Sequence, residues 1–366
     1  MPARFTIPRM MLRALLTSTT LLAVTLPAMA QTASQTTSPH QWSIVVHGGA
    51  GVIERKNMPP ATEAAYRAAM KTAIETGAAV LEKGGSSLDA VEATIEYLED
   101  NPLFNAGKGA VFTADGRNEL DSAIMDGATL KAGAVAQITR TRHPIAAARA
   151  VMEKSPAVFL AGPDADKFAA STGLQEVPNS YFFTEQRWEG LVRELKKEGK
   201  PIPPRPQGAP PAPAKPLAML EPPDAHKWGT VGVVALDEAG NIAAGTSTGG
   251  LQAKLPGRIG DSPIIGAGTY ASNHSCAVSG TGTGEYFIRL TVAREICALV
   301  EDKHMKLQAA ADEVIHQQLE GLHGDGGVIA IAPDGEAAWS FNTPGMYRAR
   351  MSQGSQPTIA IYNDEP

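Results

Sequence analysis

The chain has 366 residues, an apolar fraction of 43% and a formal net charge of −6, which suits one large globular domain or two small ones. No run of lysine and arginine forms a basic face, so nucleic acid is not expected as a partner. The Gly-rich turns at 105–109 and 280–284 depart from both phosphate-loop patterns, which argues against a nucleotide site.

The first thirty residues have the pattern of a secretory signal peptide. Arginines precede an acid-free, apolar run over residues 14–28, and Ala28-Met29-Ala30 fits the small-x-small cleavage site. An anchor helix is the alternative, but the run is short and is broken by Pro27. We expect cleavage before Gln31 and export to the periplasm or the medium. No later stretch approaches the roughly 20 apolar residues of a membrane span.

Cysteine is scarce for an exported protein. Cys276 and Cys297 are the only two, and two cysteines do not make a disulfide framework. We therefore expect free, buried thiols. No Cys/His/Asp cluster has the spacing of a zinc site.

The first 200 residues show short apolar runs that alternate with helical periodicity. Ser86 or Ser87 can cap a helix that Pro102 closes, with Leu88, Val91, Ile95 and Leu98 on its buried face. The other predicted helices are 62–83, 146–152, 163–170 and 185–197, and the predicted strands are 42–47, 119–125, 133–138 and 157–161.

A Pro-rich segment interrupts this pattern. Residues 200–223 hold ten prolines and few core formers, which predicts an extended, unpacked stretch.

After the Pro-rich segment, strands again arrange as hairpins and helices as pairs. The predicted strands are 230–236, 242–246, 276–279, 328–332, 337–341 and 358–362, and the predicted helices are 285–299 and 305–322. Asp334-Gly335 is typical of a hairpin turn. The order favours an α+β fold in which helices cover antiparallel sheets, over a doubly wound parallel sheet.

A Gly229-Thr230 junction follows the Pro-rich segment and opens an apolar run. Glycine can adopt the strained dihedrals that would expose this peptide bond to the threonine hydroxyl. A cut there would give Thr230 a nucleophilic hydroxyl and a free α-amine, whose ordinary pKa of roughly 7.7–8.0 suits a base near neutral pH. By itself, the dipeptide is more typical of an ordinary strand.

Three later segments could complete a site around this nucleophile. Residues 246–248 place hydroxyls on the strand that would pair with the first one. Arg258 and Asp261 could hold the carboxylate and ammonium of an amino acid, with a surface ion pair as the alternative. Thr281 and Gly282 offer a hydroxyl and a backbone N–H suited to an oxyanion hole, or to a helix cap.

A series of motifs then resembles the plant-type L-asparaginase/isoaspartyl aminopeptidase family. The match runs from about Trp42 to the C-terminus, apart from the Pro-rich segment. The motifs are HGGAG (47–51), FNAGKGAV (104–111), ELDSAIMDG (119–127), KAGAVA (131–136), GTVGVVALD (229–237), TSTGG (246–250), GRIGDSPIIGAGTYA (257–271) and SGTGTGE (279–285).

The resemblance implies an N-terminal nucleophile hydrolase with a four-layer αββα sandwich. It implies a precursor that cuts itself into an α chain, residues 31–229, and a β chain, residues 230–366. The Pro-rich residues 200–225 would then be a loose tail of the α chain. Family members assemble as a homodimer of such αβ units and require no cofactor.

The resemblance also assigns roles by motif position. Thr230 would be the nucleophile and Thr248 would support its activation. Thr281 with Gly282 would stabilise the oxyanion, beside Gly280 in the substrate site.

Two further residues would hold the substrate, because Arg258 would bind its α-carboxylate and Asp261 its α-amine. Asn105 is similar to a family asparagine beside the site. The loop from Leu98 to Lys108 resembles a sodium-holding loop in which mainly backbone carbonyls ligate. The ligands would come from Leu98, Glu99, Phe104, Ala106 and Lys108.

The implied reaction is hydrolysis of the β-amide of L-asparagine or of β-aspartyl (isoaspartyl) dipeptides, with release of L-aspartate. One alternative is a glycosylasparaginase-like amidase, but those enzymes usually carry Asp before the nucleophilic Thr, where this chain has Gly229. The other alternative is an exported amino-acid-binding protein without turnover.

Overall fold

The computed structural model describes residues 40–213 and 229–366. The predicted signal peptide and the second half of the Pro-rich segment lie outside the described residues. In the described part, the first stretch contains nine regular elements and two short 3-10 turns, at Arg55–Asn57 and Asn179–Tyr181. They are β1 (Ser43–Gly51), α1 (Pro60–Leu81), α2 (Ser87–Asp100), β2 (Leu120–Asp126), β3 (Ala132–Ile138), α3 (Pro144–Lys154), β4 (Phe159–Ala161), α4 (Gly162–Ser171) and α5 (Glu185–Lys197).

The second stretch begins with a strand directly after Thr230. Its elements are β5 (Val231–Leu236), β6 (Ile242–Thr248), β7 (Thr269–Ala271), β8 (Ala277–Gly282), α6 (Gly284–Leu290), α7 (Val292–Lys303), α8 (Leu307–Asp312), the π-helical turn η3 (Glu313–Leu319), β9 (Gly326–Ile331), β10 (Ala337–Phe341), β11 (Gly345–Ser352) and β12 (Thr358–Tyr362).

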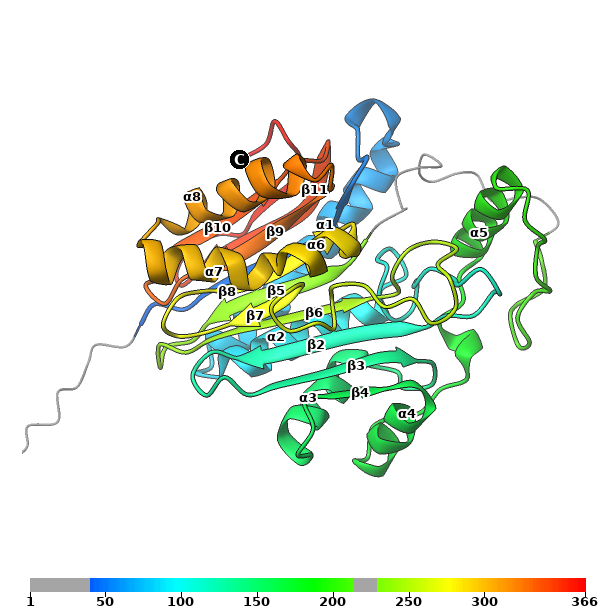
Figure 1. Cartoon of the computed structure of the whole chain (residues 1–366), viewed down its shortest axis with the longest axis horizontal. Helices are drawn as coiled ribbons and strands as arrows, with labels where there is room; N and C mark the ends of the chain where they lie inside the picture. Colours follow the sequence, from blue (N-terminus) through cyan, green and yellow to red (C-terminus); the bar gives the residue numbers. More distant parts are fainter. Residues whose placement is uncertain (1–39, 214–228) are drawn as a thin grey trace, which may run out of the picture. The chain divides into compact units, whose positions relative to one another are not determined.

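The described strands form two sheets, whose arrangement Figure 1 shows. The larger sheet has eight strands in the order β12-β11-β1-β5-β6-β2-β3-β4, and the smaller has four in the order β10-β9-β8-β7. Neighbouring strands are antiparallel except for β3 and β4. The prediction of antiparallel sheets covered by helices is therefore confirmed.

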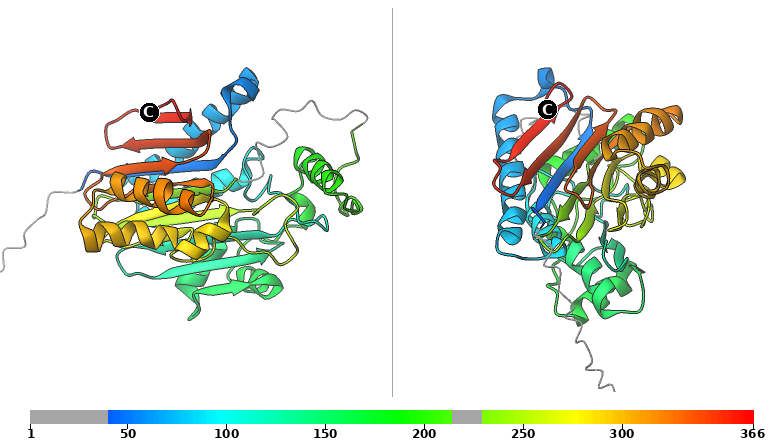
Figure 2. Two further views of the ribbon diagram at one scale, coloured as in Figure 1. Left: turned by 45° about the horizontal axis from the view of Figure 1, so that its top comes forward. Right: turned by 90° about the vertical axis from the view of Figure 1, so that its left-hand side faces the viewer.

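Three apolar layers separate four layers of structure. Helices α1, α2 and α3 pack on the outer face of the larger sheet. Side chains such as Val234 and Ile329 fill the space between the sheets, and α7, α8 and η3 cover the smaller sheet. Figure 2 shows the helical layers on opposite sides of the paired sheets. This is the αββα sandwich that the resemblance implied.

Small residues let the layers approach closely. A Cβ on Gly245 in β6 would lie 2.5 Å from Val91 and 2.9 Å from Ile95 of α2. Within the described chain, no helix has both the length and the hydropathy that crossing a bilayer requires.

Some predicted elements differ from the observed ones. The single helix expected over 285–299 is broken at Thr291, whose φ of 49° ends α6 and starts α7. The helix expected over 305–322 becomes α8 followed by the π-helical η3. The sequence did not indicate β7, which has three residues, or β11, where the buried Arg348 interrupts the apolar pattern.

The prediction of free thiols is wrong. Cys276 and Cys297 form a disulfide with a Cα–Cα distance of 5.3 Å, and both are fully buried. Helix α7 packs on β8, so residues 21 positions apart in sequence meet at a contact that no local pattern reveals.

The described part of the Pro-rich segment differs from the unpacked stretch that we expected. Both terminal nitrogens of Arg205 hydrogen-bond the carboxylate of Glu185 at the start of α5. The same guanidinium lies 4.6 Å from the ring centroid of Phe183, and its Nε donates to the carbonyl of Pro210 at 2.8 Å. One arginine therefore holds this half of the segment against α5.

Candidate active site

Thr230 lies at the entry to β5, in the middle of the larger sheet. The register pairs Val231 with Ser247, which places Thr248 of β6 across from Thr230. The Thr230 hydroxyl donates a 3.1 Å hydrogen bond to the Thr248 hydroxyl. Because both residues are buried, this contact is shielded from water.

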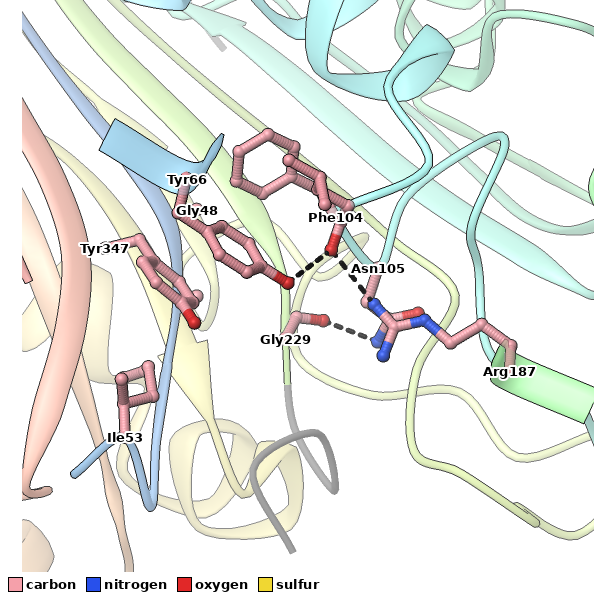
Figure 3. A pocket seen from close by; sticks show the side chains of 11 residues that line it. Gly48, Ile53, Tyr66, Phe104, Asn105, Arg187, Gly229 and Tyr347 are labelled. Carbon is pink, nitrogen blue, oxygen red and sulfur yellow. Dashed lines mark hydrogen bonds between the residues drawn. The ribbon is translucent and has the colours of Figure 1, made fainter. Parts of the chain in front are cut away.

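The carbonyl of Gly229 accepts two hydrogen bonds. Asn105 Nδ2 donates at 2.6 Å and Thr248 Oγ1 at 3.1 Å. Figure 3 shows Asn105 reaching the carbonyl from the loop after α2. The same amide group donates to Gly250 at 2.8 Å, and its oxygen accepts from the Val111 N–H at 2.9 Å. Two fixed donors on one carbonyl oxygen would stabilise negative charge there.

A pocket opens beside Thr230. It brings together six predicted site residues, namely Gly229, Thr230, Thr248, Arg258, Asp261 and Gly282. It is also lined by Gly250, Leu251, Gly260 and Ser262. Asn105 lines the neighbouring pocket, which shares Gly229.

The Arg258 side chain has an ion-pair partner that the sequence did not indicate. Its Nε and Nη2 donate to the two carboxylate oxygens of Glu285 at 2.9 and 3.0 Å. The sequence left open whether Arg258 holds a substrate carboxylate or forms a surface ion pair. In the structure it forms an ion pair, with Glu285 and not with Asp261. Arg258 also lines the pocket.

Asp261 is buried, with only 4% of its surface exposed. Burial raises the pKa of its carboxyl to about 7, with Arg258 opposing the shift. Glycines surround the carboxylate, and a Cβ on Gly268 or Gly284 would lie 2.8 or 2.7 Å from its oxygens. A Cβ on Gly280 would lie 3.6 Å from Oδ2, so the backbone of Gly280 also lies close to the Asp261 carboxylate.

The predicted oxyanion residues end β8. Gly282 lines the pocket with a φ of 154°, and a Cβ there would lie 2.4 Å from the carbonyl oxygen of Asp325. Thr281 is fully buried and accepts a 3.3 Å hydrogen bond from the N–H of Ala50. Thr281 is not among the described residues that line the pocket of Thr230.

Comparison with known proteins identifies the relatives of this site. The family profile described as asparaginase matches residues 40–361. The chain belongs to this asparaginase family.

Curated members are similar over nearly their whole length. The isoaspartyl peptidase of Escherichia coli (strain K12) is 48% identical over 322 residues, which cover 88% of this chain and 96% of that protein. The probable isoaspartyl peptidase/L-asparaginase 2 of Arabidopsis thaliana is 41% identical, over 88% and 99%. The isoaspartyl peptidase/L-asparaginase of Homo sapiens is 38% identical, over 81% and 89%. The chain is thus a hydrolase of the asparaginase family, whose enzymes need no cofactor.

Sequence reasoning missed a buried ion pair behind this asparaginase-family site. Asp121 lies opposite Thr248 in the register of β2 and β6. Lys254 Nζ is 3.9 Å from Asp121 Oδ2, and both side chains are fully buried. The position of Asp121 in the ELDSAIMDG motif is a signal that could indicate a role for it. The single lysine at 254 carries no such signal.

A buried hydroxyl network also lies between the sheets. His47 Nε2 is 3.0 Å from Ser279 Oγ, which lies 2.7 Å from Thr246 Oγ1. A Cβ on Gly232 would lie 1.9 Å from Ser279 Oγ, so only glycine permits this crossing. Burial lowers the pKa of His47 to about 3, which keeps its ring neutral.

The loop that resembles the sodium site presents backbone carbonyls. A Cβ on Gly109 would lie 2.6 Å from the carbonyl oxygen of Pro102 and 2.7 Å from that of Phe104, and one on Gly107 would lie 2.3 Å from that of Glu99. These carbonyl oxygens thus lie close to the two glycines, and carbonyl oxygens are ligands that suit a hard cation.

The individual sodium ligands stay a prediction. The described residues contain no acidic, histidine or cysteine cluster that could hold a metal, so any ion in this loop would depend on the carbonyls. The Glu99 carbonyl already accepts from the N–H of Lys108 at 2.6 Å, which leaves it one further lone pair. A bound cation there would brace the loop that presents Asn105.

Proposed function

We propose that this chain cuts itself at Gly229-Thr230 and then hydrolyses L-asparagine and β-aspartyl (isoaspartyl) dipeptides. One observation carries the proposal: the Thr230 hydroxyl and the Gly229 carbonyl both contact Thr248, beside a pocket that holds Arg258 and Asp261. These contacts support a role for the Thr230 hydroxyl both in the cleavage of the precursor and in the mature enzyme.

In the first reaction, Thr230 Oγ1 attacks the carbonyl carbon of Gly229. The developing oxyanion is the oxygen that Asn105 and Thr248 already contact. The C–N bond breaks, the nitrogen takes a proton, and an ester joins the two chains until water hydrolyses it. Gly229 keeps a carboxylate, and Thr230 gains a free α-amine.

In the second reaction, the α-amine of Thr230 accepts the hydroxyl proton while Oγ1 attacks the side-chain carbonyl of the substrate. The proton passes to the leaving ammonia or amine. An aspartyl ester of Thr230 remains, and water releases L-aspartate from it. Arg258 would bind the α-carboxylate and ionised Asp261 the α-ammonium, and Gly282 would contribute to the oxyanion hole.

A Thr230→Ala variant tests this proposal. We expect wild-type protein on a denaturing gel to give a fragment whose N-terminal sequence is TVGVVALD, and the variant to stay uncut. Release of leucine from β-Asp-Leu should fall by at least about a thousandfold in the variant. A wild-type chain that stays intact for days, or a variant that still cleaves, would refute self-processing.

Substrate competition separates this function from the glycosylasparaginase alternative. We expect β-Asp-Leu to be hydrolysed with a higher kcat/KM than a glycosylated asparagine, and the opposite order would favour the alternative. Binding of L-asparagine without any turnover would instead favour an amino-acid-binding protein.

We also propose export, and assembly of two αβ units into a homodimer. The buried Cys276–Cys297 disulfide supports export, because disulfides persist in oxidising compartments. Recovery from the periplasm of a chain that begins at Gln31 tests export, and a light-scattering mass tests the dimer. A full-length chain in the cytoplasm, or a mass of one αβ unit, would contradict the respective proposal.

A further inference from the structure

The guanidinium of Arg258 occupies a slot whose walls are glycines. A Cβ on Gly260 would lie 2.8 Å from Nη1, one on Gly284 would lie 3.1 Å from Nη2, and one on Gly250 would lie 3.4 Å from Nη1. Gly250 and Gly260, the two nearest Nη1, line the pocket of Thr230. The Nη1 end of the group therefore faces the pocket.

Glu285 holds the opposite side of the same group. Its two oxygens accept from Nε and Nη2 at 2.9 and 3.0 Å, which is the bidentate geometry of a strong ion pair. The Glu285 side chain is 52% exposed, against 14% for Arg258. The hydrogen bond from Arg258 lowers the pKa of Glu285, so the carboxylate is charged at neutral pH.

A guanidinium has five N–H donors, and Glu285 uses two of them. The two on Nη1 and the second one on Nη2 remain, and one N–H of Nη1 together with the remaining N–H of Nη2 forms the end edge of the fork. A planar substrate carboxylate can bind that edge bidentately without displacing Glu285.

We propose that Glu285 is a positioning residue for substrate recognition. It fixes the side edge of the Arg258 guanidinium, so that the end edge is presented to the α-carboxylate of the substrate. Without Glu285, the long arginine side chain would have to be ordered by the substrate, at a cost in rotamer entropy. This inference rests on the proposed function, in which Arg258 binds that carboxylate.

The test compares β-Asp-Leu with the same dipeptide in which the aspartyl α-carboxylate is an amide. Leucine release reports both reactions. In Glu285→Ala, we expect KM for the carboxylate substrate to rise about tenfold with kcat within about twofold, since uniform binding is lost. The values for the amidated substrate should stay unchanged. Glu285→Gln keeps an acceptor oxygen and should recover part of the loss.

Two further variants make the result decisive. Glu301→Ala removes an acidic partner from an exposed ion pair with Arg294 on α7 and should leave both substrates unaffected. Arg258→Ala should abolish discrimination between the substrates; if it does not, the proposed carboxylate clamp itself fails. Correct self-cleavage reports folding of each variant.

If Arg258→Ala abolishes the discrimination as expected, three outcomes would still overturn the proposed role of Glu285. An unchanged KM in both Glu285 variants would mean that Arg258 needs no support. A lower KM would mean that Glu285 competes with the substrate. Equal losses on both substrates would mean a general structural role.

Discussion

At the scale of single residues, the site is built by burial of polar groups that must be paired or neutral. Thr230, Thr248 and Asp261 all lie below a tenth exposed. Hydroxyls tolerate such burial when hydrogen-bonded, but a carboxylate resists it. Of these three residues, Asp261 is therefore the one whose protonation should make stability depend on pH.

The Asp261→Asn variant should reveal this pH dependence as a change in thermal stability. Burial raises the pKa of Asp261 to about 7 in the folded protein, against 3.8 for the free group. Between these pH values the folded state holds a proton that the unfolded state has lost, so this residue makes stability fall as pH rises. The Tm of the Asn variant relative to wild type should therefore increase from pH 4 to pH 8.

The measurement is thermal unfolding of both proteins at several pH values. A Tm difference that stays constant across this window would contradict the shifted pKa. Activity on β-Asp-Leu should be lost in the variant at every pH, since the neutral amide cannot pair with the ammonium.

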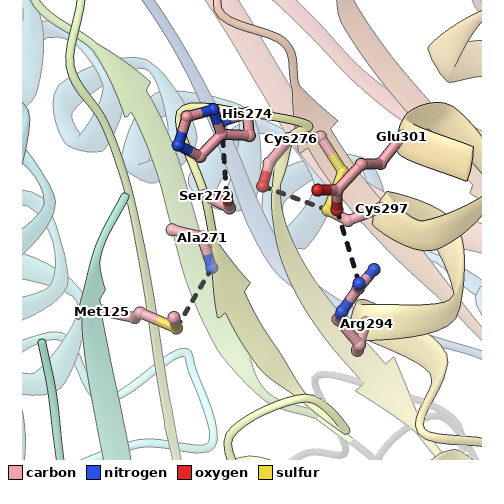
Figure 4. Close-up of a disulfide and its surroundings, with 8 residues drawn as sticks. All are labelled: Met125, Ala271, Ser272, His274, Cys276, Arg294, Cys297 and Glu301. Carbon is pink, nitrogen blue, oxygen red and sulfur yellow. Dashed lines mark hydrogen bonds and ion pairs between the residues drawn. A yellow bond between two sulfur atoms is a disulfide. The ribbon is translucent and has the colours of Figure 1, made fainter. Parts of the chain in front are cut away.

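At the scale of elements, α7 braces two parts of the site. The N–H groups of Ala293 and Arg294 donate to the carbonyls of Ala267 and Gly266, at 3.0 and 2.8 Å. These carbonyls belong to the loop that follows Asp261. One turn further along, Cys297 is bonded to Cys276, the residue before β8 (Figure 4). The disulfide thus ties the strand that ends at Gly282 to the helix that supports the Asp261 loop.

Replacement of both cysteines by alanine should lower stability by about 3 kcal/mol, because a bridge over some 20 residues restricts the unfolded chain by that amount. The measurement is thermal unfolding with and without a reductant. Wild type should lose stability in the reductant, whereas the cysteine-free variant should not respond. Equal Tm values for the two proteins would show that the disulfide contributes nothing to stability.

At the scale of the whole described molecule, strands from the two predicted chains interleave. Strand β1 precedes the predicted cut in sequence, yet it pairs with both β11 and β5, which follow the predicted cut. Strand β6, also after the cut, pairs with β2 from before it. Separation of the chains would break three antiparallel pairings and open the core on both faces of the sheet.

The cut protein should therefore behave as one particle. The two fragments should co-elute in size-exclusion chromatography under native conditions and separate only in guanidinium chloride. Two peaks without denaturant would contradict the interleaved sheet. An uncut Thr230→Ala protein is the control, because it should elute at the same native volume.

The sequence by itself determined most of the local elements, the Gly229-Thr230 junction and most of the residues that line the pocket. Apolar periodicity, turn residues and ordered motifs are all local signals. They were sufficient to predict which segments form the core. The two mismatched helices arose where Thr291 takes a left-handed conformation and where α8 continues into a π-helix, because side-chain periodicity does not report such changes in the backbone.

Only the tertiary structure decided the long-range pairings. Glu285 reaches Arg258 across 27 positions of sequence, and Lys254, from the loop after β6, approaches Asp121 of β2. The disulfide and the docking of Arg205 onto α5 are of the same kind. Each depends on how two elements pack, and the free energy of such a contact exists only once the chain is folded, so it leaves no periodic trace in the sequence.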